Sequence, residues 1–361
     1  MPVDRRPERQ SALRGLLEQE GLDGLLITHL PNIRYLTGFT GSAALLLVWP
    51  DATVLLTDFR YAAQAPSEVG TSAAVEIDPV STWDRLKRIC ADRAEETLGF
   101  EAHALTVRDA GRLRDCARRT APAGELVERL RATKAPEEVQ AIEAAAALAH
   151  EALAEVLPGV RVGDAERDIA ARLEFALRRR GSEWHPFQTI AASGPRAALP
   201  HARTSERCVG RGEWLLLDFG AEVDGYCADL TRTVVVGARA DERQRVVYEV
   251  VEAAQRRARE QVRPGMTGRE ADALAREVIA SRGFGEAFGH SLGHGLGLEV
   301  HEAPRLSAAN DQPLPAGAVV TIEPGIYLPD WGGVRLEDDV HLGPEGPRCL
   351  TDGRTELIEL V

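Results

Sequence analysis

The chain has 361 residues, of which 44% are apolar and 27% charged, and its net charge is −13. This length suits two domains with ordinary cores, and the acidic balance with scattered basic residues argues against a nucleic-acid partner. No run approaches about 20 apolar residues and the charged N-terminus has no apolar segment, so neither a membrane span nor a secretory signal is expected. The five cysteines lie far apart without a C-x-x-C pair, which predicts a reducing, cytoplasmic setting. They are Cys90, Cys116, Cys208, Cys227 and Cys349.

The first part of the chain, residues 1–128, is predicted to form a separate α/β domain. Short apolar runs bounded by turn residues predict buried strands, and longer amphipathic stretches between them predict helices. The strands are expected at 24–28, 43–49 and 53–57, and the helices at 8–20, 81–95 and 106–119. A new helix is expected after Pro136, because proline suits the first helical turn and Glu137 and Glu138 favour its positive end.

The second part, residues 129–361, is predicted to consist of two duplicated halves. Each half begins with a helix, a Pro-Gly pair and a second helix that ends at an Arg-Gly pair, and the two Pro-Gly pairs lie 106 residues apart, at 158 and 264. The helices are expected at about 137–157 and up to 181, then at about 241–262 and up to 283, the last opened by a capping box at 267–270. A strand-rich segment with acidic residues follows each helical pair. Asp218 and Glu323 are 105 residues apart, and Asp229 and Glu337 are 108 apart, which favours a duplication.

Four carboxylates are predicted to gather between these halves. A turn centred between Val223 and Asp224 would place Asp218 directly opposite Asp229, with Cβ atoms about 5 Å apart. A loop centred near Asp330 would likewise place Glu323 opposite Glu337. Solvent exposure or salt bridges could account for any single one of these acids. Because Asp218 and Glu323 each follow an apolar run, exposure does not explain these two.

Charge balance then predicts the cofactor. Four carboxylates that lie close together repel one another, and two divalent cations would neutralise them. Oxygen-rich ligands with one imidazole suit Mn²⁺ best, with Co²⁺ or Zn²⁺ also compatible. Such a pair of ions can activate a water molecule for hydrolysis.

Histidines are densest in the glycine-rich segment 288–302, which contains His290, His294 and His301. The glycines there would allow the backbone to approach a ligand closely. His201 lies 100 residues before His301, so each half could contribute an imidazole. The histidines at 29, 103, 150 and 341 lack such surroundings and are predicted to be structural.

Several motifs together resemble the pita-bread metallopeptidases, and more narrowly the Xaa-Pro peptidases, prolidase and aminopeptidase P. They are LDFG (217–220), YCADLTRT (226–233), GHGLGLEVHE (293–302), TIEPGIY (321–327) and GVRLED (333–338). NIRYLTGF (32–39) and TDFRY (57–61) resemble the creatinase-like N-terminal domain of that group. The resemblance implies an α+β pita-bread catalytic domain with duplicated halves after an α/β creatinase-like N-terminal domain. It also implies a dinuclear metal site.

The resemblance assigns roles by position. The implied metal ligands are Asp218, Asp229, His294, Glu323 and Glu337, with Asp229 and Glu337 bridging. Glu323 would also accept a proton, His201 or His301 would stabilise the oxyanion, and His290 and Arg335 would line or support the substrate site.

The predicted activity is hydrolysis of an Xaa-Pro bond at a peptide N-terminus. Proline-containing dipeptides are favoured as substrates, which would make the chain a prolidase, and longer peptides remain the alternative, as for aminopeptidase P. Creatinase-like enzymes act without metal, methionine aminopeptidases usually lack the long N-terminal domain, and non-enzymatic pita-bread modules have lost ligands. The intact ligand set argues against the first and the last. A homodimer is expected from the family.

Overall fold

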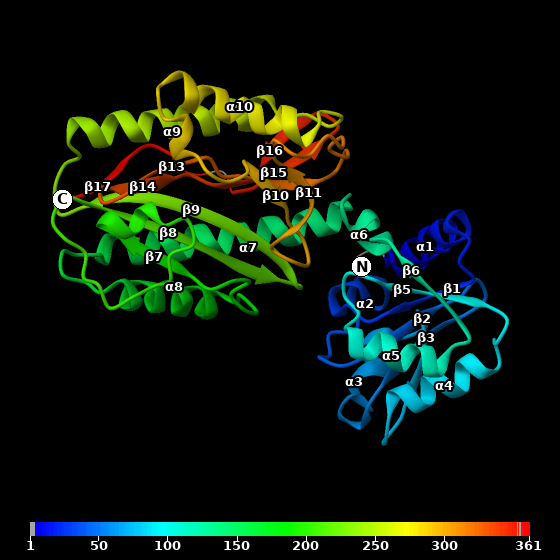
Figure 1. Ribbon diagram of the computed structural model, residues 1–361. Helices are drawn as coiled ribbons and strands as arrows, with labels where there is room; N and C mark the ends of the chain where they lie inside the picture. The colour runs from blue at the N-terminus through cyan, green and yellow to red at the C-terminus, as the bar shows by residue number, and fades with distance from the viewer. Residues whose placement is uncertain (1–3, 352, 354) are drawn as a thin grey trace. The chain divides into compact units, whose positions relative to one another are not determined.

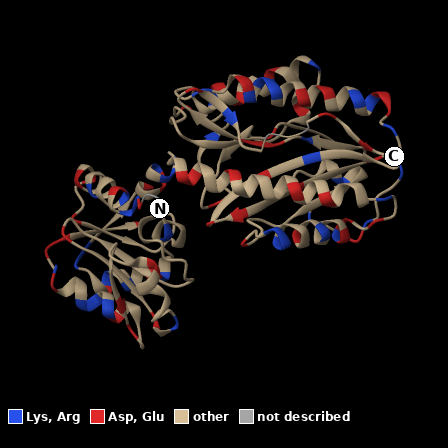
Figure 2. Ribbon diagram, turned by 180° about the vertical axis from the view of Figure 1, so that it is seen from behind, with Lys and Arg blue, Asp and Glu red and all other residues tan. Residues whose placement is uncertain are grey.

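The computed structural model describes residues 4–351, 353 and 355–361. It divides into two compact units, one ending at Arg131 and the other beginning at Ala132 (Figure 1). Acidic and basic residues are interspersed along the helices of both units, whereas the strands are largely uncharged (Figure 2). Among the described residues, no helix is both long and apolar enough to cross a membrane.

The N-terminal unit is built on a mixed six-stranded sheet with the order β4-β3-β2-β1-β5-β6. Its strands are β1 (Gly24–Ile27), β2 (Leu45–Val48), β3 (Thr53–Thr57), β4 (Ala74–Ile77), β5 (Thr97–Glu101) and β6 (Arg119–Ala123). Its helices are α1 (Arg6–Glu20), α2 (Leu30–Thr37), α3 (Gln64–Val69), α4 (Thr82–Ala91), α5 (Val107–Cys116) and α6 (Leu126–Arg131). Leu86 of α4 and Leu113 of α5 pack against Leu26 and Leu47 on one face of the sheet. The predicted α/β architecture is confirmed.

The C-terminal unit contains the two predicted halves, each with a helical pair and a sheet (Figure 1). The first half contains α7 (Pro136–Val156), α8 (Glu166–Arg180), β7 (Ile190–Ser193), β8 (Glu213–Val223) and β9 (Tyr226–Val236). Strand β17 (Ile358–Leu360) completes its sheet, which has the order β17-β9-β8-β7.

The second half contains α9 (Glu242–Gln261) and α10 (Gly268–Ser281). Its larger sheet has the order β11-β10-β12-β15-β16, and β13 and β14 form a separate ribbon. These strands are β10 (Gly293–Gly295), β11 (Glu302–Leu306), β12 (Val319–Ile322), β13 (Gly325–Leu328), β14 (Gly332–Arg335), β15 (Asp338–Gly343) and β16 (Gly346–Cys349). The predicted capping box is present, because Thr267 accepts from the Glu270 amide and Glu270 accepts from that of Thr267.

Strand β8 is apolar over most of its length because both of its faces are buried. Leu215, Leu217 and Phe219 pack against α7 and α8. Trp214 and Leu216 face the opposite side and pack with α9 and the second half. Because side chains alternate along a strand, Asp218 points to the same side as Leu216, between the two halves.

The predicted register of the β8–β9 hairpin is wrong by two residues. Asp218 lies opposite Thr231, and Asp229 lies opposite Gly220. The cause is the turn, whose two central residues are Asp224 and Gly225, with φ of 50° and 76°. Positive φ at both positions is typical of a two-residue hairpin turn, which shifts the turn centre by one residue. Because the slip is an even number of residues, both aspartates still project from one face.

The second predicted register is found in the pairs that flank the two glutamates, although Glu323 and Glu337 do not pair with each other. Ile322 lies opposite Asp338, and Gly325 lies opposite Arg335. The ladder is interrupted between these pairs at Pro324, which has no N–H to donate. Glu337 instead pairs with Thr231 of the first half, whose carbonyl accepts from the Glu337 amide at 3.2 Å.

Candidate metal centre and substrate cavity

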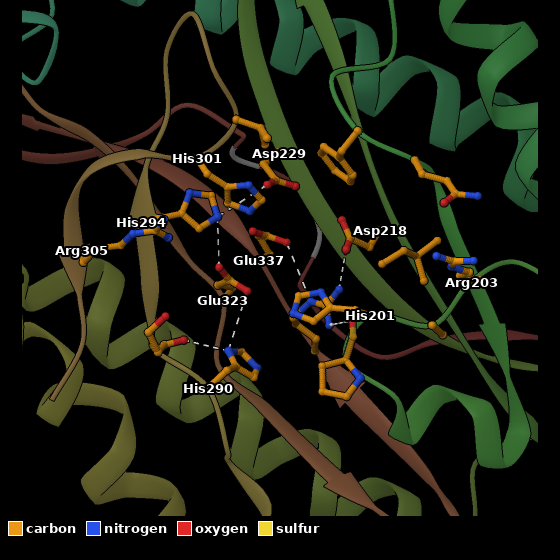
Figure 3. Close-up of a pocket in the computed structure, with 18 residues that line it drawn as sticks. His201, Arg203, Asp218, Asp229, His290, His294, His301, Arg305, Glu323 and Glu337 are labelled. Atoms are coloured by element: carbon orange, nitrogen blue, oxygen red, sulfur yellow. Dashed lines mark hydrogen bonds and ion pairs between the residues drawn. The ribbon is translucent and has the colours of Figure 1, made fainter. Parts of the chain in front are cut away.

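All nine site residues predicted from the sequence line one cavity of about 410 Å³ in the C-terminal unit (Figure 3). They are His201, Asp218, Asp229, His290, His294, His301, Glu323, Arg335 and Glu337. The remaining wall is formed by nine residues that were not singled out in the sequence, including Phe187, Ile190, Arg203 and Arg305. The cavity therefore joins strands of both halves.

The tightest part of the cavity is a buried cluster of carboxylates around one imidazole. Asp229, His294 and Glu337 each offer one ligand atom, and these atoms lie within 4.8 Å of one another. The Nε2 atom of His294 is 3.4 Å from Glu323 Oε1 and 4.0 Å from Asp229 Oδ2. Among the described residues, nothing donates a hydrogen bond to the buried Oδ1 atoms of Asp218 and Asp229. Since unsatisfied carboxylate oxygens are costly to bury, this donor set fits divalent cations.

The electrostatics of the cluster point the same way. Burial raises the pKa of Asp229 and of Glu337 well above the usual range, and the neighbouring carboxylates raise both further. Burial also raises the pKa of Glu323 to about 7, against the opposing effect of Arg335. Bound cations would favour the ionised forms of all three groups.

His294 has its Nδ1 atom 3.0 Å from the Gly295 carbonyl oxygen. A carbonyl can only accept, so Nδ1 carries the proton and the Nε2 lone pair faces the carboxylates. Burial lowers the pKa of His294 to about 3, with the nearby His301 adding to the effect, so the ring is neutral. A neutral imidazole fixed in this tautomer by a backbone carbonyl is suited to bind a metal.

Arg335 links residues of the two halves through hydrogen bonds of its side chain. Its guanidinium donates to Asp218 Oδ2 at 2.5 Å, to the Tyr327 hydroxyl at 2.9 Å and to the Pro200 carbonyl at 3.1 Å. Its Nε donates to Thr231 Oγ1 at 3.1 Å, and Thr231 in turn donates to Glu337 Oε2 at 2.5 Å. Arg335 thus orients two of the carboxylates from a buried position.

His290 belongs to the same network. Its Nδ1 lies 2.8 Å from the Ser291 carbonyl oxygen, and its Nε2 lies 2.9 Å from the Tyr327 hydroxyl. Nδ1 therefore donates, and Nε2 accepts from Tyr327. Burial and then Arg335 lower the pKa of His290 to about 4. His201 and His301 are exposed at the cavity wall, and the His301 ring centroid lies 4.4 Å from that of His294.

Four contributors to the site were missed in the sequence: Thr231, Tyr327, Arg203 and Arg305. Thr231 could have been found, because it lies two residues after Asp229 and so shares its face. Tyr327 and Arg305 were missed because their place in the site depends on which strands pair. The sequence gives no register for the strand that carries His294. Arg203 lies two residues after His201, with no pattern that marks it.

A buried carboxylate and imidazole centre between duplicated halves defines the chain as a metallopeptidase of the pita-bread type. Residues 140–344 match metallopeptidase family M24, and residues 9–133 match the creatinase/prolidase N-terminal domain. The chain belongs to metallopeptidase family M24, which implies divalent-metal binding. The predicted family, fold class and enzyme class are confirmed.

Individual relatives resemble the chain over nearly its whole length. The Xaa-Pro dipeptidase of Pyrococcus furiosus is 36% identical over 97% of this chain and 99% of its own. The structure of an Xaa-Pro dipeptidase from Bacillus anthracis matches with a TM-score of 0.95 and 38% identity, covering 98% of this chain and 100% of that one. That of an X-Pro aminopeptidase from Thermotoga maritima MSB8 matches with a TM-score of 0.89 and 37% identity, covering 97% and 99%.

Proposed function

We propose that the chain hydrolyses the Xaa-Pro bond of dipeptides with the help of two divalent metal ions, preferably Mn²⁺. The observation that carries the proposal is the buried cluster of Asp229, His294 and Glu337, with Glu323 3.4 Å from His294. In the same cavity, one oxygen each of Asp218 and Asp229 has no hydrogen bond among the described residues. Asp218, Asp229, His294, Glu323 and Glu337 would hold the ions. When bound, the ions supply Lewis-acid chemistry, polarising a carbonyl and activating water.

The protein groups then have separate tasks. Glu323 lines the cavity 3.4 Å from His294 and would accept a proton and pass it to the leaving proline nitrogen. That nitrogen has no N–H in the substrate, so it must gain a proton as the bond breaks. His201 and His301 face the cavity and would hydrogen-bond the scissile carbonyl oxygen. Tyr327 and Arg335 keep His290 and Asp218 in position.

A dipeptidase must also recognise the free carboxylate of proline. Arg335 is poorly placed for this, because it is buried and already donates to four groups of the protein. Arg305 is exposed, lines the cavity and lies opposite His294 in the β10–β11 ladder. We therefore propose that Arg305 binds the terminal carboxylate of the substrate's proline. The alternative is an aminopeptidase that acts on longer peptides, and the similarity to the Thermotoga enzyme supports it.

The test is hydrolysis of Ala-Pro and Ala-Pro-Ala by chelator-treated protein resupplied with Mn²⁺, Co²⁺ or Zn²⁺. Cleavage of Ala-Pro, lost in Arg305→Ala, supports the dipeptidase. Preferential cleavage of Ala-Pro-Ala would establish the aminopeptidase instead. Asp229→Asn and His294→Ala should lose bound metal, measured by elemental analysis, whereas His341→Ala outside the cavity should retain it. Wild-type metal content in the two site variants would refute the ligand assignment.

We also propose that the protein is cytoplasmic and forms a homodimer. All five cysteines are free thiols, which suits a reducing compartment. Light scattering on the purified chain would measure its mass in solution, and a monomer at micromolar concentration would contradict the dimer.

A further inference from the structure

Two arginines lie at opposite ends of the cavity, with the carboxylate cluster between them. In Figure 3, Arg305 lies beyond His294 and Arg203 lies beyond Asp218. Arg305 is carried by β11, where it is the direct partner of His294 on β10. The two guanidinium groups therefore flank the carboxylate cluster, Arg305 from β11 and Arg203 from the loop that precedes β8.

Arg203 lies one segment further from the carboxylates than Arg305 does. Its neighbour Thr204 accepts from the Ala191 amide of β7 at 3.2 Å and donates to the Thr189 carbonyl at 2.8 Å. Strand β7 in turn pairs with β8, with Ile190 opposite Asp218. The backbone at Arg203 therefore lies on the far side of β7 from Asp218.

Both guanidinium groups are available to a ligand. Across the described part of the chain, neither Arg203 nor Arg305 has a hydrogen bond or an ion pair from its side chain, in contrast to Arg335. Both residues are exposed at the wall of the cavity. A solvated surface arginine would look the same in isolation, but these two face a space that must hold the substrate.

A dipeptide has a negatively charged partner for one of the two arginines, and the other arginine still lacks one. Every Xaa-Pro substrate has one terminal carboxylate, which the proposed function assigns to Arg305. With the proline carboxylate at Arg305, the end of the cavity that contains Arg203 is left for the Xaa residue. A second arginine at that end finds an opposite charge only if Xaa is acidic. The greater distance of Arg203 favours glutamate, whose carboxylate reaches further than that of aspartate.

We propose that Arg203 is a specificity-determining residue that selects dipeptides with an acidic residue before proline, and Glu-Pro above Asp-Pro. This inference rests on the proposed dipeptidase activity. Phe187 and Ile190 also line the cavity, with Ile190 opposite Asp218 on β7, and would contact the aliphatic part of the glutamate side chain. The preference is electrostatic, so it should weaken as salt screens the pair.

The test compares kcat/KM for Glu-Pro and Gln-Pro, which have nearly the same shape and differ in charge. The wild-type enzyme with Mn²⁺ should favour Glu-Pro about fivefold, the size expected for one partly exposed ion pair. Arg203→Ala should bring the ratio close to one, Arg203→Lys should retain a preference, and Arg203→Glu should favour Lys-Pro over Gln-Pro. Arg239→Ala removes an exposed arginine outside the cavity and should keep the wild-type ratio.

The outcomes separate this inference from the function beneath it. If Gln-Pro and Ala-Pro are cleaved but Glu-Pro has no advantage, Arg203 does not select acidic substrates and the dipeptidase assignment stands. If the advantage exists but persists in Arg203→Ala, another group provides it and the assignment of Arg203 is overturned. If no Xaa-Pro dipeptide is cleaved with any of the three metals, both proposals fail. A ratio that declines from 0.05 to about 1 M salt, at constant Gln-Pro activity, would support the ion pair.

Discussion

Replacing Thr231 with valine removes one hydroxyl from the centre of the site while keeping its volume. That hydroxyl donates to Glu337 Oε2 at 2.5 Å and accepts from Arg335 Nε at 3.1 Å, and Thr231 is fully buried. The variant leaves a buried carboxylate and a buried guanidinium each short of one hydrogen bond. Arg335 would still donate to Asp218, but its link to Glu337 would be reduced to the ion pair between Nε and Oε2, which are 3.9 Å apart.

The expected loss of stability follows from these two contacts. A hydrogen bond to a charged group is worth about 1.5–3 kcal/mol, so the loss of two should lower the free energy of unfolding by about 3–6 kcal/mol. Because Thr231 orients a proposed metal ligand, affinity for Mn²⁺ should also fall, by about 10- to 100-fold. Urea unfolding of metal-free protein measures the first effect, and titration calorimetry with Mn²⁺ measures the second.

Thr233→Val is the matched control. Thr233 is buried on the same face of β9, and its hydroxyl donates to the Arg335 carbonyl at 2.9 Å and accepts from the Arg335 amide at 3.2 Å. The Thr233 variant should lose about 1–2 kcal/mol of stability and bind Mn²⁺ as the wild type does. Equal metal affinity in the Thr231 and Thr233 variants would refute the idea that Thr231 positions Glu337.

Three further results are expected. Gly293→Ala should destabilise the protein by about 3 kcal/mol or more in urea unfolding, because the added Cβ would lie 1.9 Å from the Thr321 carbonyl oxygen. Gly289→Ala is the control, since its Cβ meets nothing within 4 Å and the stability should be nearly unchanged. His290 has its pKa lowered from 6.5 to about 4 by burial and then by Arg335, so below pH 6.5 the unfolded state binds more protons. Unfolding free energy of the metal-free protein should therefore fall as pH decreases from 6.5 to about 4, by up to about 1.4 kcal/mol per pH unit from this group, and an unchanged slope in His290→Gln would contradict this. The exposed Cys208 should react with a thiol reagent in the native protein before Cys90, which is buried and whose pKa burial raises to about 12; mass mapping that finds Cys90 modified first would contradict it.

Much of the fold was predictable because its signals are local. The runs that form β8 and β12 are apolar on both faces, and an acid lies within the first run and directly after the second, at Asp218 and Glu323. Pro-Gly pairs at the same offset mark the helical pairs of both halves. The five carboxylate and imidazole residues could therefore be identified from the sequence, and the structure brings all of them to one cavity.

The register of β8 and β9 was not predictable from apolar pattern alone, because a shift of two residues keeps every side chain on the same face. The left-handed backbone at Asp224 and Gly225 decided it, and so placed Thr231 rather than Asp229 opposite Asp218.

The sequence by itself determined the two domains, the duplicated halves and the acidic and histidine residues of the site, since spacing and hydrophobic pattern carry that information along the chain. Only the tertiary structure decided how these residues are held and what else faces the substrate. The contacts of Arg335 with Asp218 and Thr231 span more than 100 residues of sequence, and Arg203 and Arg305 reach one cavity from opposite halves. Such contacts depend on which strands pair across the interface of the halves, and no local pattern specifies that.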